Sequence, residues 1–333
     1  MVQYPHEQFK STFIAKGDYM KIVILDRATL GADLDISIPL ESDVVSYDAS
    51  APEQVADRIA DADVIFVNKV RLTPENLRYA KPLKLICEAA TGYDNIDIDY
   101  CREHSIAVCN VPGYSTYSVA QITVSIVLCL INRMKEYTNF VSDGSYSAGN
   151  TANKLEPVFH ELNSMTWGIV GYGNIGAHVA DVARAFGCRV IAFKKHETNA
   201  VKCVDIDTLM KESDIISVHL PLSDQTRGII SADRIAMMKS NVVFVNAARG
   251  AVADEAALCR AAKEQKIYLG SDVYSTEPFK ESSPYFGIKG QNNVCLTPHM
   301  AWGAYEARKR CFEEMIANMQ SFLNGETRNR VDI

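Results

Sequence analysis

The sequence predicts an α/β protein made of two doubly wound parallel-sheet domains, and three observations support this fold class. Short apolar runs alternate with helix-like segments along most of the chain, as in parallel α/β units. The length of 333 residues is about twice that of a typical domain. A second and clearer α/β series begins at Met165, after the polar stretch SDGSYSAGNT at residues 142–151.

The first series contains four predicted strands and one well-marked helix. The strands are expected at residues 20–26, 62–68, 84–90 and 106–112, and the helix at 52–62. The motif NVPGYS then breaks the pattern before a long apolar helix at residues 118–132. This helix is shorter than the roughly 18 apolar residues of a membrane span and contains Gln121 and Thr123, so we expect it to be buried in the protein. Residues 142–151 are expected to form an exposed loop.

The second series continues through six further apolar runs to a helical C-terminal segment. The runs are TWGIVG, CRVIAFK, SDIISVHL, NVVFVNAARG, KIYLGSDVY and NVCLTPH. The last segment, from Ala301, has apolar residues at helical spacing, and Gly325 is expected to end the helix.

Composition excludes several classes of partner. A net charge of -7 argues against nucleic-acid or membrane-surface binding. The nine cysteines include no C-x-x-C pair and are scattered through apolar runs, which indicates reduced thiols in a cytoplasmic protein. The sequence has no cluster of metal-ligating residues, so we expect no metal site. The polar N-terminus, MVQYPHEQFKSTF, has no secretory pattern.

The sharpest local motif is a glycine-rich turn between a strand and a helix. Gly171, Gly173 and Gly176 form G-x-G-x-x-G, followed by an amphipathic helix and a further strand. The first glycine permits a tight turn, the second lets the backbone approach a pyrophosphate, and the third lets the helix pack on the strand. Asn174 and Ile175 open the helix, whose free N–H groups would bind phosphates. We therefore predict a dinucleotide site, against the alternative of a glycine-rich turn without a ligand.

The segment IAFKKHE, residues 191–197, bears on which dinucleotide is bound. An acid about 20 residues beyond the glycines usually accepts hydrogen bonds from the ribose hydroxyls of NAD. Lys194 stands at that position and Lys195 follows it. An ammonium attracts a 2′-phosphate and cannot accept a hydrogen bond. The sequence therefore favours NADP(H), while NAD(H) stays possible if both lysines face solvent.

Three later strands end in residues that carry charge or exchange protons. Arg249 follows VNAA, Glu277 lies in SDVYSTEP, and His299 lies in LTPH. Ligands of open α/β sheets bind outside the carboxyl ends of the strands. An arginine matches a carboxylate and polarises a neighbouring carbonyl, and a histidine held by a carboxylate can donate a proton. The trio therefore suits reduction of a 2-oxo acid by a nicotinamide cofactor.

Over nearly its whole length the chain resembles the D-isomer-specific 2-hydroxy-acid dehydrogenase family. The motifs that carry the resemblance are AATGYDNID, NVPGYSTYSVAQ, GIVGYGNIG, VHLPLSDQTRGII, VNAARGAVADEAAL, SDVYSTEP and LTPHMAW. It implies a Rossmann cofactor domain, residues 113–298, inserted into a flavodoxin-like substrate domain, residues 1–112 and 299–333. It also implies a homodimer, formed through the helix after Tyr114 and the 142–151 loop.

The family's functional residues carry over position by position. The resemblance implies catalysis by Arg249, Glu277 and His299, and substrate binding by Arg249, the Thr91–Gly92 turn and Val70. Asp272 matches a residue that contacts the nicotinamide amide. Besides the turn and the two lysines, the resemblance implies further cofactor contacts at His219, Pro221, Thr226 and Ala247.

Within the family the chain is most similar to glycerate dehydrogenases, also called hydroxypyruvate reductases. The motifs NKV…LT, AATGYDNID and HMAW carry this similarity. Trp302 would close a wall of the substrate pocket or pack in the core. Two departures are Lys194, in place of the dinucleotide acid, and Ile122, where close relatives would have histidine.

Three functions remain open. The first is NADPH-dependent reduction of hydroxypyruvate or glyoxylate. The second is a different substrate on the same scaffold, as in a D-lactate or an aromatic D-2-hydroxy-acid dehydrogenase. The third is a nucleotide-sensing corepressor, a binding protein that the complete Arg-Glu-His set permits, although the chain has no Pro- or Ser-rich tail for recruiting partners.

Overall fold

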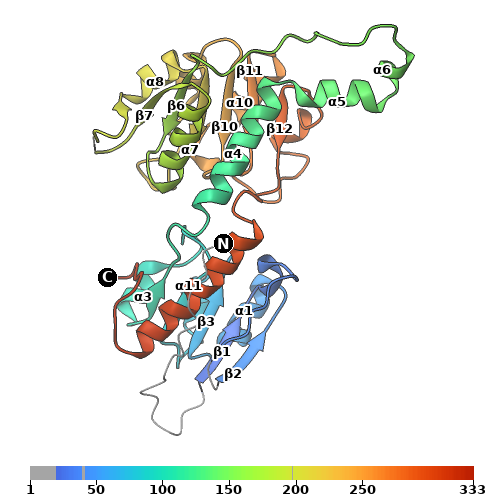
Figure 1. The fold of residues 1–333 in the computed structure, drawn as a ribbon. Coiled ribbons are helices and arrows are strands. Elements are labelled where there is room, and N and C mark those ends of the chain that lie inside the picture. The colour runs from blue at the N-terminus through green and yellow to red at the C-terminus, as the bar shows by residue number, and fades with distance from the viewer. Residues whose placement is uncertain (1–19, 40–41, 197) are drawn as a thin grey trace. The chain divides into compact units, whose positions relative to one another are not determined.

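The computed structural model describes residues 20–39, 42–196 and 198–333. Two compact units are present, each built on a parallel sheet (Figure 1). Among the described residues, unit 1 comprises those up to Tyr114 together with Arg308–Ile333, and unit 2 comprises those in Ser115–Ala307. The polar N-terminal stretch MVQYPHEQFKSTF, for which the sequence analysis found no secretory pattern, lies outside the described residues.

Unit 1 contains a five-stranded parallel sheet in the order β2-β1-β3-β4-β5. Its strands match the predicted apolar runs, with the addition of the edge strand β2, whose pattern is too polar to be recognised from sequence. The order reverses direction between β1 and β3, and open α/β sheets usually bind ligands outside the carboxyl ends of the strands at such a point. The elements are β1 (Met20–Ile24), η1 (Arg27–Leu30), β2 (Ser42–Ser46), α1 (Pro52–Ile59), β3 (Val64–Val67), α2 (Pro74–Leu77), β4 (Leu85–Glu88), α3 (Ile98–Glu103), β5 (Ala107–Cys109) and α11 (Tyr305–Leu323), of which α11 begins in unit 2.

Helices cover both faces of this sheet because alternate strand residues point to opposite sides. Ile65 and Val67 pack with Val55 and Ile59 of α1 in one apolar cluster. Phe66 points the other way, and its ring meets that of Phe312 in α11 edge-on, with centroids 6.2 Å apart. The segment after α11 returns to the sheet, where Arg330 forms an antiparallel bridge with Cys109.

Unit 2 contains a seven-stranded parallel sheet in the order β12-β11-β10-β9-β6-β7-β8. The first strand, β6, lies where the order reverses, as in dinucleotide-binding sheets. Its elements are α4 (Thr116–Ile131), α5 (Met134–Ser142), α6 (Ser145–Ala148), β6 (Thr166–Val170), α7 (Asn174–Ala185), β7 (Arg189–Phe193), β8 (Lys202–Cys203), α8 (Ile206–Glu212), β9 (Ile215–Val218), α9 (Ala232–Ala236), β10 (Val242–Asn246), η2 (Gly250–Val252), α10 (Glu255–Lys263), β11 (Ile267–Ser271), η3 (Pro284–Gly287) and β12 (Val294–Leu296).

The core of unit 2 lies on both faces of this sheet. One cluster holds Ile169 with residues of α4 and α7, and the other holds Val170 with residues of α8, α9 and α10. Helix α4 is largely buried, as the sequence predicts for residues 118–132. No single helix in the described chain is long and apolar enough to span a membrane. Helices α4 and α5 reach the length and apolar composition of a membrane span only when they are taken together, and this pair is bent by 66°.

Two segments differ from the sequence expectation. Residues 142–151 are exposed as predicted, but they contain the short helix α6 rather than only loop. The sequence places the second domain boundary at residue 299, whereas unit 2 extends to Ala307. A hydrogen bond within unit 2 holds the segment 299–307: the Ser118 hydroxyl donates to the Ala301 carbonyl at 2.5 Å.

Candidate active site

The glycine-rich turn joins β6 to α7 and has the geometry of a phosphate cradle. Gly171 has a φ of +102°, and a Cβ there would meet the backbone of His219 at 2.8 Å. A Cβ on Gly176 would lie 2.2 Å from the carbonyl oxygen of Gly171. A Cβ on Gly173 would meet nothing within 4 Å, so the space beside the N-terminus of α7 is open. Gly173 is the N-cap and supplies no side-chain cap, which leaves N–H groups of the first turn available for an anion.

Lys194 follows β7 directly and lies beside this turn. Its Nζ atom is 5.8 Å from the centre of the Tyr172 ring, and Tyr172 belongs to the turn itself. Lys194 is half-buried, whereas Lys195 is exposed. The positive charge of Lys194 is therefore held near the glycine-rich turn at the end of the second strand.

His219 follows β9 and is held as a neutral ring. Its Nε2 atom lies 3.0 Å from the Ser217 hydroxyl. Burial lowers the pKa of His219 to about 3. Its Nδ1 atom is buried and meets no hydrogen-bond partner among the described residues. The imidazole therefore contributes no positive charge to this edge near neutral pH.

Further residues expected to contact the cofactor lie after neighbouring strands. Thr226 folds back so that its hydroxyl donates to the Pro221 carbonyl at 2.6 Å. Ala247 comes directly after β10 and is half-buried. With the turn and Lys194, these residues are at the carboxyl ends of β6, β7, β9 and β10 in one parallel sheet.

Glu277 and His299 are in direct contact. Nδ1 of His299 lies 2.6 Å from Oε2 of Glu277, and the two side chains are 21% and 34% exposed. The other carboxylate oxygen, Oε1, accepts the N–H of Tyr274 at 2.9 Å. Because both side chains are partly exposed, the pair is accessible to a small ligand. With Nδ1 engaged by the carboxylate, Nε2 is the nitrogen that can exchange a proton with that ligand.

The loop that carries His299 is fixed by Asp272. This buried carboxylate accepts the Thr297 hydroxyl at 2.6 Å and the N–H groups of Met300 and Ala301, both at 2.9 Å. Burial raises the pKa of Asp272, and these hydrogen bonds act in the opposite direction. The backbone of His299 has a φ of +51°, an uncommon conformation for a residue other than glycine. Asp272 therefore stabilises a strained loop, which the sequence comparison with the family did not indicate.

Trp302 packs back onto this loop. Its indole Nε1 donates to the carbonyl of His299 at 3.0 Å, and its side chain is half-buried. The tryptophan therefore supports the position of His299.

Arg249 follows β10, which lies beside β11 in the sheet. Its carbonyl accepts the Asn246 amide at 2.9 Å, and its Nη1 donates to the Ala248 carbonyl at 2.9 Å. The next residue, Gly250, fits tightly against the loop after β11, since a Cβ there would lie 2.1 Å from the nitrogen of Ser275. The Arg249 backbone is thus packed against the loop that contains Glu277.

Glu255 also supports this loop and was missed in the sequence. Its Oε1 accepts the N–H of Ser275 at 2.8 Å, and burial raises the pKa of its carboxyl. An acidic residue in the first turn of a predicted helix is common, so the motif VADEAAL carries no signal that separates Glu255 from an ordinary helix terminus.

Val70, Thr91 and Gly92 belong to unit 1, at the carboxyl ends of β3 and β4. The N–H of Val70 donates to Oδ2 of Asp26 at 3.1 Å, and its carbonyl accepts the Asn95 amide at 3.2 Å. The Thr91 hydroxyl donates to the Val111 carbonyl at 2.9 Å. These interactions hold the backbone next to Val70 and Thr91 within unit 1.

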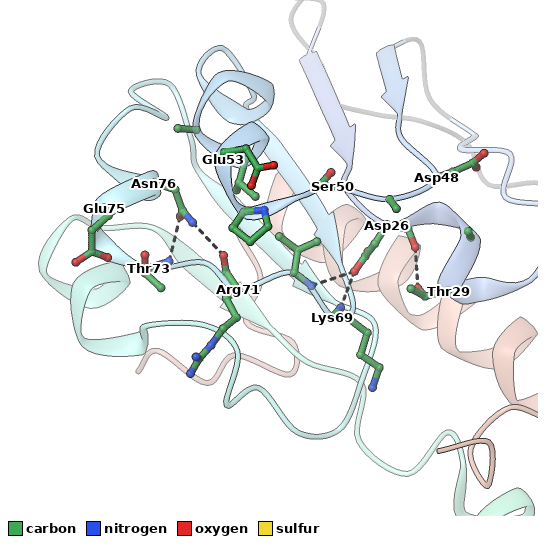
Figure 2. A pocket seen from close by; sticks show the side chains of 16 residues that line it. Asp26, Thr29, Asp48, Ser50, Glu53, Lys69, Arg71, Thr73, Glu75 and Asn76 are labelled. Carbon is green, nitrogen blue, oxygen red and sulfur yellow. Dashed lines mark hydrogen bonds between the residues drawn. The ribbon is translucent and has the colours of Figure 1, made fainter. Parts of the chain in front are cut away.

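Two buried carboxyl groups, Asp26 and Glu88, hold the backbone near Val70. Neither was predicted from the sequence. Asp26 accepts the N–H groups of Asn68, Lys69 and Val70, at distances from 2.6 to 3.2 Å. Figure 2 shows Asp26 in the lining of a cavity in unit 1, with its hydrogen bond to Lys69 drawn. Glu88 is fully buried, accepts the Asn95 amide at 3.0 Å, and burial raises its pKa well above the usual range. The signal for Glu88 was present, because an acid inside the apolar run KLICEAA is unusual.

Comparisons with known proteins agree with this geometry. Residues 124–301 match the family model "D-isomer specific 2-hydroxyacid dehydrogenase, NAD binding domain". The chain is 32% identical over 324 residues to a hydroxypyruvate reductase from Blautia hydrogenotrophica, covering 94% of this chain and 100% of that protein.

Solved structures give the same picture. An acyclic imino acid reductase in complex with NADPH and D-Arg has a TM-score of 0.84 and 29% identity, covering 94% of this chain and 100% of that chain. A D-lactate dehydrogenase from Aquifex aeolicus, complexed with NAD and lactic acid, has a TM-score of 0.80 and 29% identity, covering 94% and 99%.

Proposed function

Because the chain belongs to the D-isomer specific 2-hydroxyacid dehydrogenase family, we propose that it reduces hydroxypyruvate and glyoxylate with NADPH. The family activity itself is hydride transfer between a nicotinamide cofactor and a 2-hydroxy acid. The observation that carries the proposal is the His299–Glu277 pair, whose nitrogen and oxygen lie 2.6 Å apart.

His299 is the proposed proton donor to the carbonyl oxygen of the 2-oxo acid. Reduction converts a carbonyl into an alcohol, so one proton must reach that oxygen as the carbon is reduced. Glu277 binds Nδ1 of the ring, which fixes the ring orientation and keeps the proton to be donated on Nε2. Loss of that proton leaves an imidazole that returns to the starting form by taking up a proton from solvent.

Arg249 is the proposed anchor for the substrate carboxylate and the polarising group for its carbonyl. A guanidinium can donate two parallel hydrogen bonds to a carboxylate, and it remains charged throughout the working pH range. Its place after β10, beside the loop that carries Glu277, supports this role. Val70, Thr91 and Gly92 of unit 1 are proposed as substrate-binding residues. Trp302 of unit 2 is likewise proposed as a substrate-binding residue.

The glycine-rich turn fits a nicotinamide dinucleotide. The spaces beside Gly171 and Gly176 are closed to any side chain, while the space beside Gly173 and the N-terminus of α7 is open. When bound, the cofactor supplies the hydride. Gly171, Gly173, Asn174, Ile175 and Gly176 would hold its pyrophosphate. His219, Pro221, Thr226, Ala247 and Asp272 are proposed to line the remaining cofactor site.

The preference for NADPH over NADH rests on Lys194. Its ammonium group lies near Tyr172 of the turn, where a 2′-phosphate would be attracted and a ribose hydroxyl would find no acceptor. Lys195 is proposed to add a second, more exposed positive charge. The NADPH complex of the similar imino acid reductase is compatible with this choice, although the similar D-lactate dehydrogenase is complexed with NAD.

Unit 1 is proposed to act as the substrate domain and unit 2 as the cofactor domain. A homodimer is proposed through α4 and the segment that includes α5 and α6. Apolar side chains support it, because Val141 is 58% exposed, Leu155 73% and Val158 65%. A cytoplasmic location stays a prediction from the cysteine content.

Replacing Glu277 with glutamine tests the proposed proton donor. The amide keeps the size of the side chain but removes its negative charge, so the imidazolium loses its partner. We expect kcat for hydroxypyruvate reduction to fall by about a hundredfold, within the usual range for loss of acid–base assistance. The KM for NADPH should change little. The matched control is Glu281→Gln, an exposed acid in the same loop region. Near-normal kcat in Glu277→Gln would contradict the assigned roles.

A further inference from the structure

Glu255 is the first residue of α10, and its carboxylate binds the loop that follows β11. Its Oε1 atom accepts the backbone N–H of Ser275 at 2.8 Å, across 20 residues of sequence. An acid in the first turn of a helix ordinarily interacts with the N–H groups of that helix or with solvent. In α10 the capping role belongs to Asp254, which accepts the N–H of Ala257 at 2.9 Å. Glu255 binds the neighbouring loop instead.

The N–H that Glu255 binds is next in the chain to the one that Glu277 binds. The N–H of Tyr274 donates to Oε1 of Glu277 at 2.9 Å, and Oε2 of Glu277 lies 2.6 Å from Nδ1 of His299. Two consecutive backbone N–H groups are therefore divided between two carboxylates. Their rigid peptide planes share the α-carbon of Tyr274, so a shift of this backbone would move both hydrogen bonds at once.

The loop is fixed on its other side by the side chain of Tyr274. This buried tyrosine donates its hydroxyl to the Thr297 carbonyl at 2.9 Å, and its ring meets that of Tyr285 edge-on, with centroids 4.9 Å apart. Ser275, in contrast, is exposed and gains little from packing. The hydrogen bond from Glu255 supplies a restraint at this end of the peptide.

The carboxylate of Glu255 also lies against the turn that follows Arg249. A Cβ added to Gly250 would be 2.7 Å from Oε1 of Glu255 and 2.1 Å from the nitrogen of Ser275. The missing side chain at residue 250 thus leaves the space in which the carboxylate and the Ser275 amide meet. Glu255 is in contact with both segments that carry proposed catalytic residues.

Attraction between charges does not account for this position. Burial raises the pKa of Glu255, the hydrogen bonds from Ser275 lower it, and the nearby charge of Glu277 raises it further. A half-buried acid beside another acid is unfavourable unless its hydrogen bonds compensate. The hydrogen bond to the loop is therefore the interaction that favours an acceptor at this place.

We propose that Glu255 is a positioning residue for the proton transfer, because by holding the Tyr274–Ser275 backbone it fixes the orientation in which Glu277 binds the ring of His299. This inference rests on the proposed function, since it requires His299 to donate the proton. The role depends on an oxygen acceptor that reaches the Ser275 N–H, and not on the negative charge.

Three substitutions of Glu255 separate reach from charge. Glu255→Gln keeps an oxygen acceptor at the same reach without the charge, Glu255→Asp keeps the charge but is one methylene shorter, and Glu255→Ala removes both. We expect kcat for hydroxypyruvate reduction to stay within about threefold of wild type in Glu255→Gln. It should fall about tenfold or more in the other two variants, because a small misplacement of reacting groups can lower a rate by up to about a hundredfold.

The loss should appear in kcat, while the KM for NADPH changes by less than about twofold, because the glycine-rich turn is not altered. The matched control is Asp233→Ala, which removes an exposed first-turn acid from α9 and should leave kcat unchanged. An electrostatic role at the helix terminus would give the reverse order, with Glu255→Asp near normal and Glu255→Gln impaired, and would overturn the inference. Normal kcat in all three variants would overturn it as well.

A double-mutant cycle with Glu277→Ala tests whether Glu255 acts through Glu277. Once the side chain of Glu277 is gone its orientation no longer matters, so Glu255→Ala should lower kcat by less than about twofold in that background. Equal losses in both backgrounds would overturn the inference, because a general loosening of the fold would act in either. Glu255→Asp replaces Glu255→Ala in the cycle if the alanine variant does not fold. Wild-type protein that reduces none of hydroxypyruvate, glyoxylate and pyruvate would overturn the proposed function, and this inference with it.

Discussion

Lys194 is the residue on which the proposed preference for NADPH depends, and it lies at the edge of the glycine-rich turn. The half-buried ammonium lies 5.8 Å from the ring of Tyr172, which belongs to the glycine-rich turn. A 2′-phosphate near this point would be stabilised by a charge-assisted hydrogen bond, worth roughly 1.5 to 3 kcal/mol. An NAD ribose would instead need an acceptor that lysine does not have.

Reversing this charge should reverse the cofactor preference. In Lys194→Asp the carboxylate repels a 2′-phosphate and accepts ribose hydroxyls. We expect the ratio of kcat/KM for NADPH to that for NADH to fall by about a hundredfold, as loss of one charge-assisted contact and gain of a repulsion imply. Steady-state kinetics with hydroxypyruvate measure the ratio. Lys211→Asp, an exposed charge reversal on α8, is the control, and an unchanged ratio in Lys194→Asp would show that Lys194 does not contact the cofactor.

His299 illustrates a second point at residue scale, because its proposed role as proton donor depends on neighbours that are not themselves proposed to react. Glu277 holds the ring, and Asp272 holds the loop by accepting hydrogen bonds from the Thr297 hydroxyl and from the N–H groups of Met300 and Ala301. The motif LTPHMAW indicates the histidine but not the carboxylate below it. The acid lies 25 residues before Thr297 in sequence, and only the pairing of β11 with β12 brings them together.

At the scale of elements, β4 ends in a buried carboxyl that links two loops of unit 1. Glu88 accepts the Asn95 amide at 3.0 Å, and the same amide donates to the Val70 carbonyl at 3.2 Å. Burial raises the pKa of Glu88 well above its usual range, so the carboxyl is protonated in the folded protein at pH values where the unfolded chain is ionised. Folded protein therefore binds more protons than unfolded protein in this range.

This proton linkage predicts how stability changes with pH. The contribution of Glu88 is complete below its unfolded pKa, near pH 4.3, and is lost as pH rises toward the folded pKa, by up to about 1.4 kcal/mol per pH unit. Glu88→Gln removes this dependence, so the variant should become more stable relative to wild type as pH increases from 5 to 8. Urea unfolding at a series of pH values measures the difference. Parallel curves for Glu88→Gln and wild type would show that Glu88 ionises normally, and Glu53→Gln, an exposed acid, serves as the control.

At the scale of the whole molecule, the segment with α5 and α6 presents apolar side chains to solvent. Neither helix has a buried residue. Val141, Leu155 and Val158 are each more than half exposed. Helices that bury nothing gain little stability from packing, which favours a partner surface on a second copy.

Charge placed in this segment should dissociate the proposed dimer. We expect wild-type protein to have about twice the chain mass of 36.9 kDa in light scattering, and Val158→Asp to approach the chain mass. Ile333→Asp, which places the same charge on another highly exposed apolar residue, should leave the mass unchanged. A monomeric wild-type protein, or a Val158→Asp variant that stays dimeric, would contradict the proposed interface.

Sequence patterns predicted much of this molecule, and the misses have physical causes. Buried parallel strands are continuous apolar runs, so β1, β3, β4, β5 and the strands of unit 2 other than β8 could be recognised. Strand β8 has only two residues, neither of them buried, and was not predicted. The edge strand β2 is mostly exposed and half polar, and such a pattern does not separate strand from loop. Helix α6 has only four residues in a polar segment, which is too short for a helical pattern of apolar residues to be recognised.

In the candidate site, too, residues that follow a local sequence pattern could be predicted, and residues that depend on long-range contacts could not. Arg249, Glu277 and His299 could be proposed because each follows an apolar strand, and parallel strands deliver their ends to one edge. The acids Asp26 and Glu255 were not predicted, and Asp272 was predicted only as a contact of the nicotinamide amide. All three accept hydrogen bonds from backbone N–H groups that are distant in the sequence. Those contacts depend on the packing of loops, which no local pattern in the sequence encodes.

The measurement that tests the central claim most directly is the identity and chirality of the product from hydroxypyruvate. Purified protein would be incubated with hydroxypyruvate and NADPH, and glycerate separated on a chiral column. We expect D-glycerate alone, formed in proportion to the NADPH consumed. L-glycerate, a racemic product, or NADPH consumed without glycerate would contradict it.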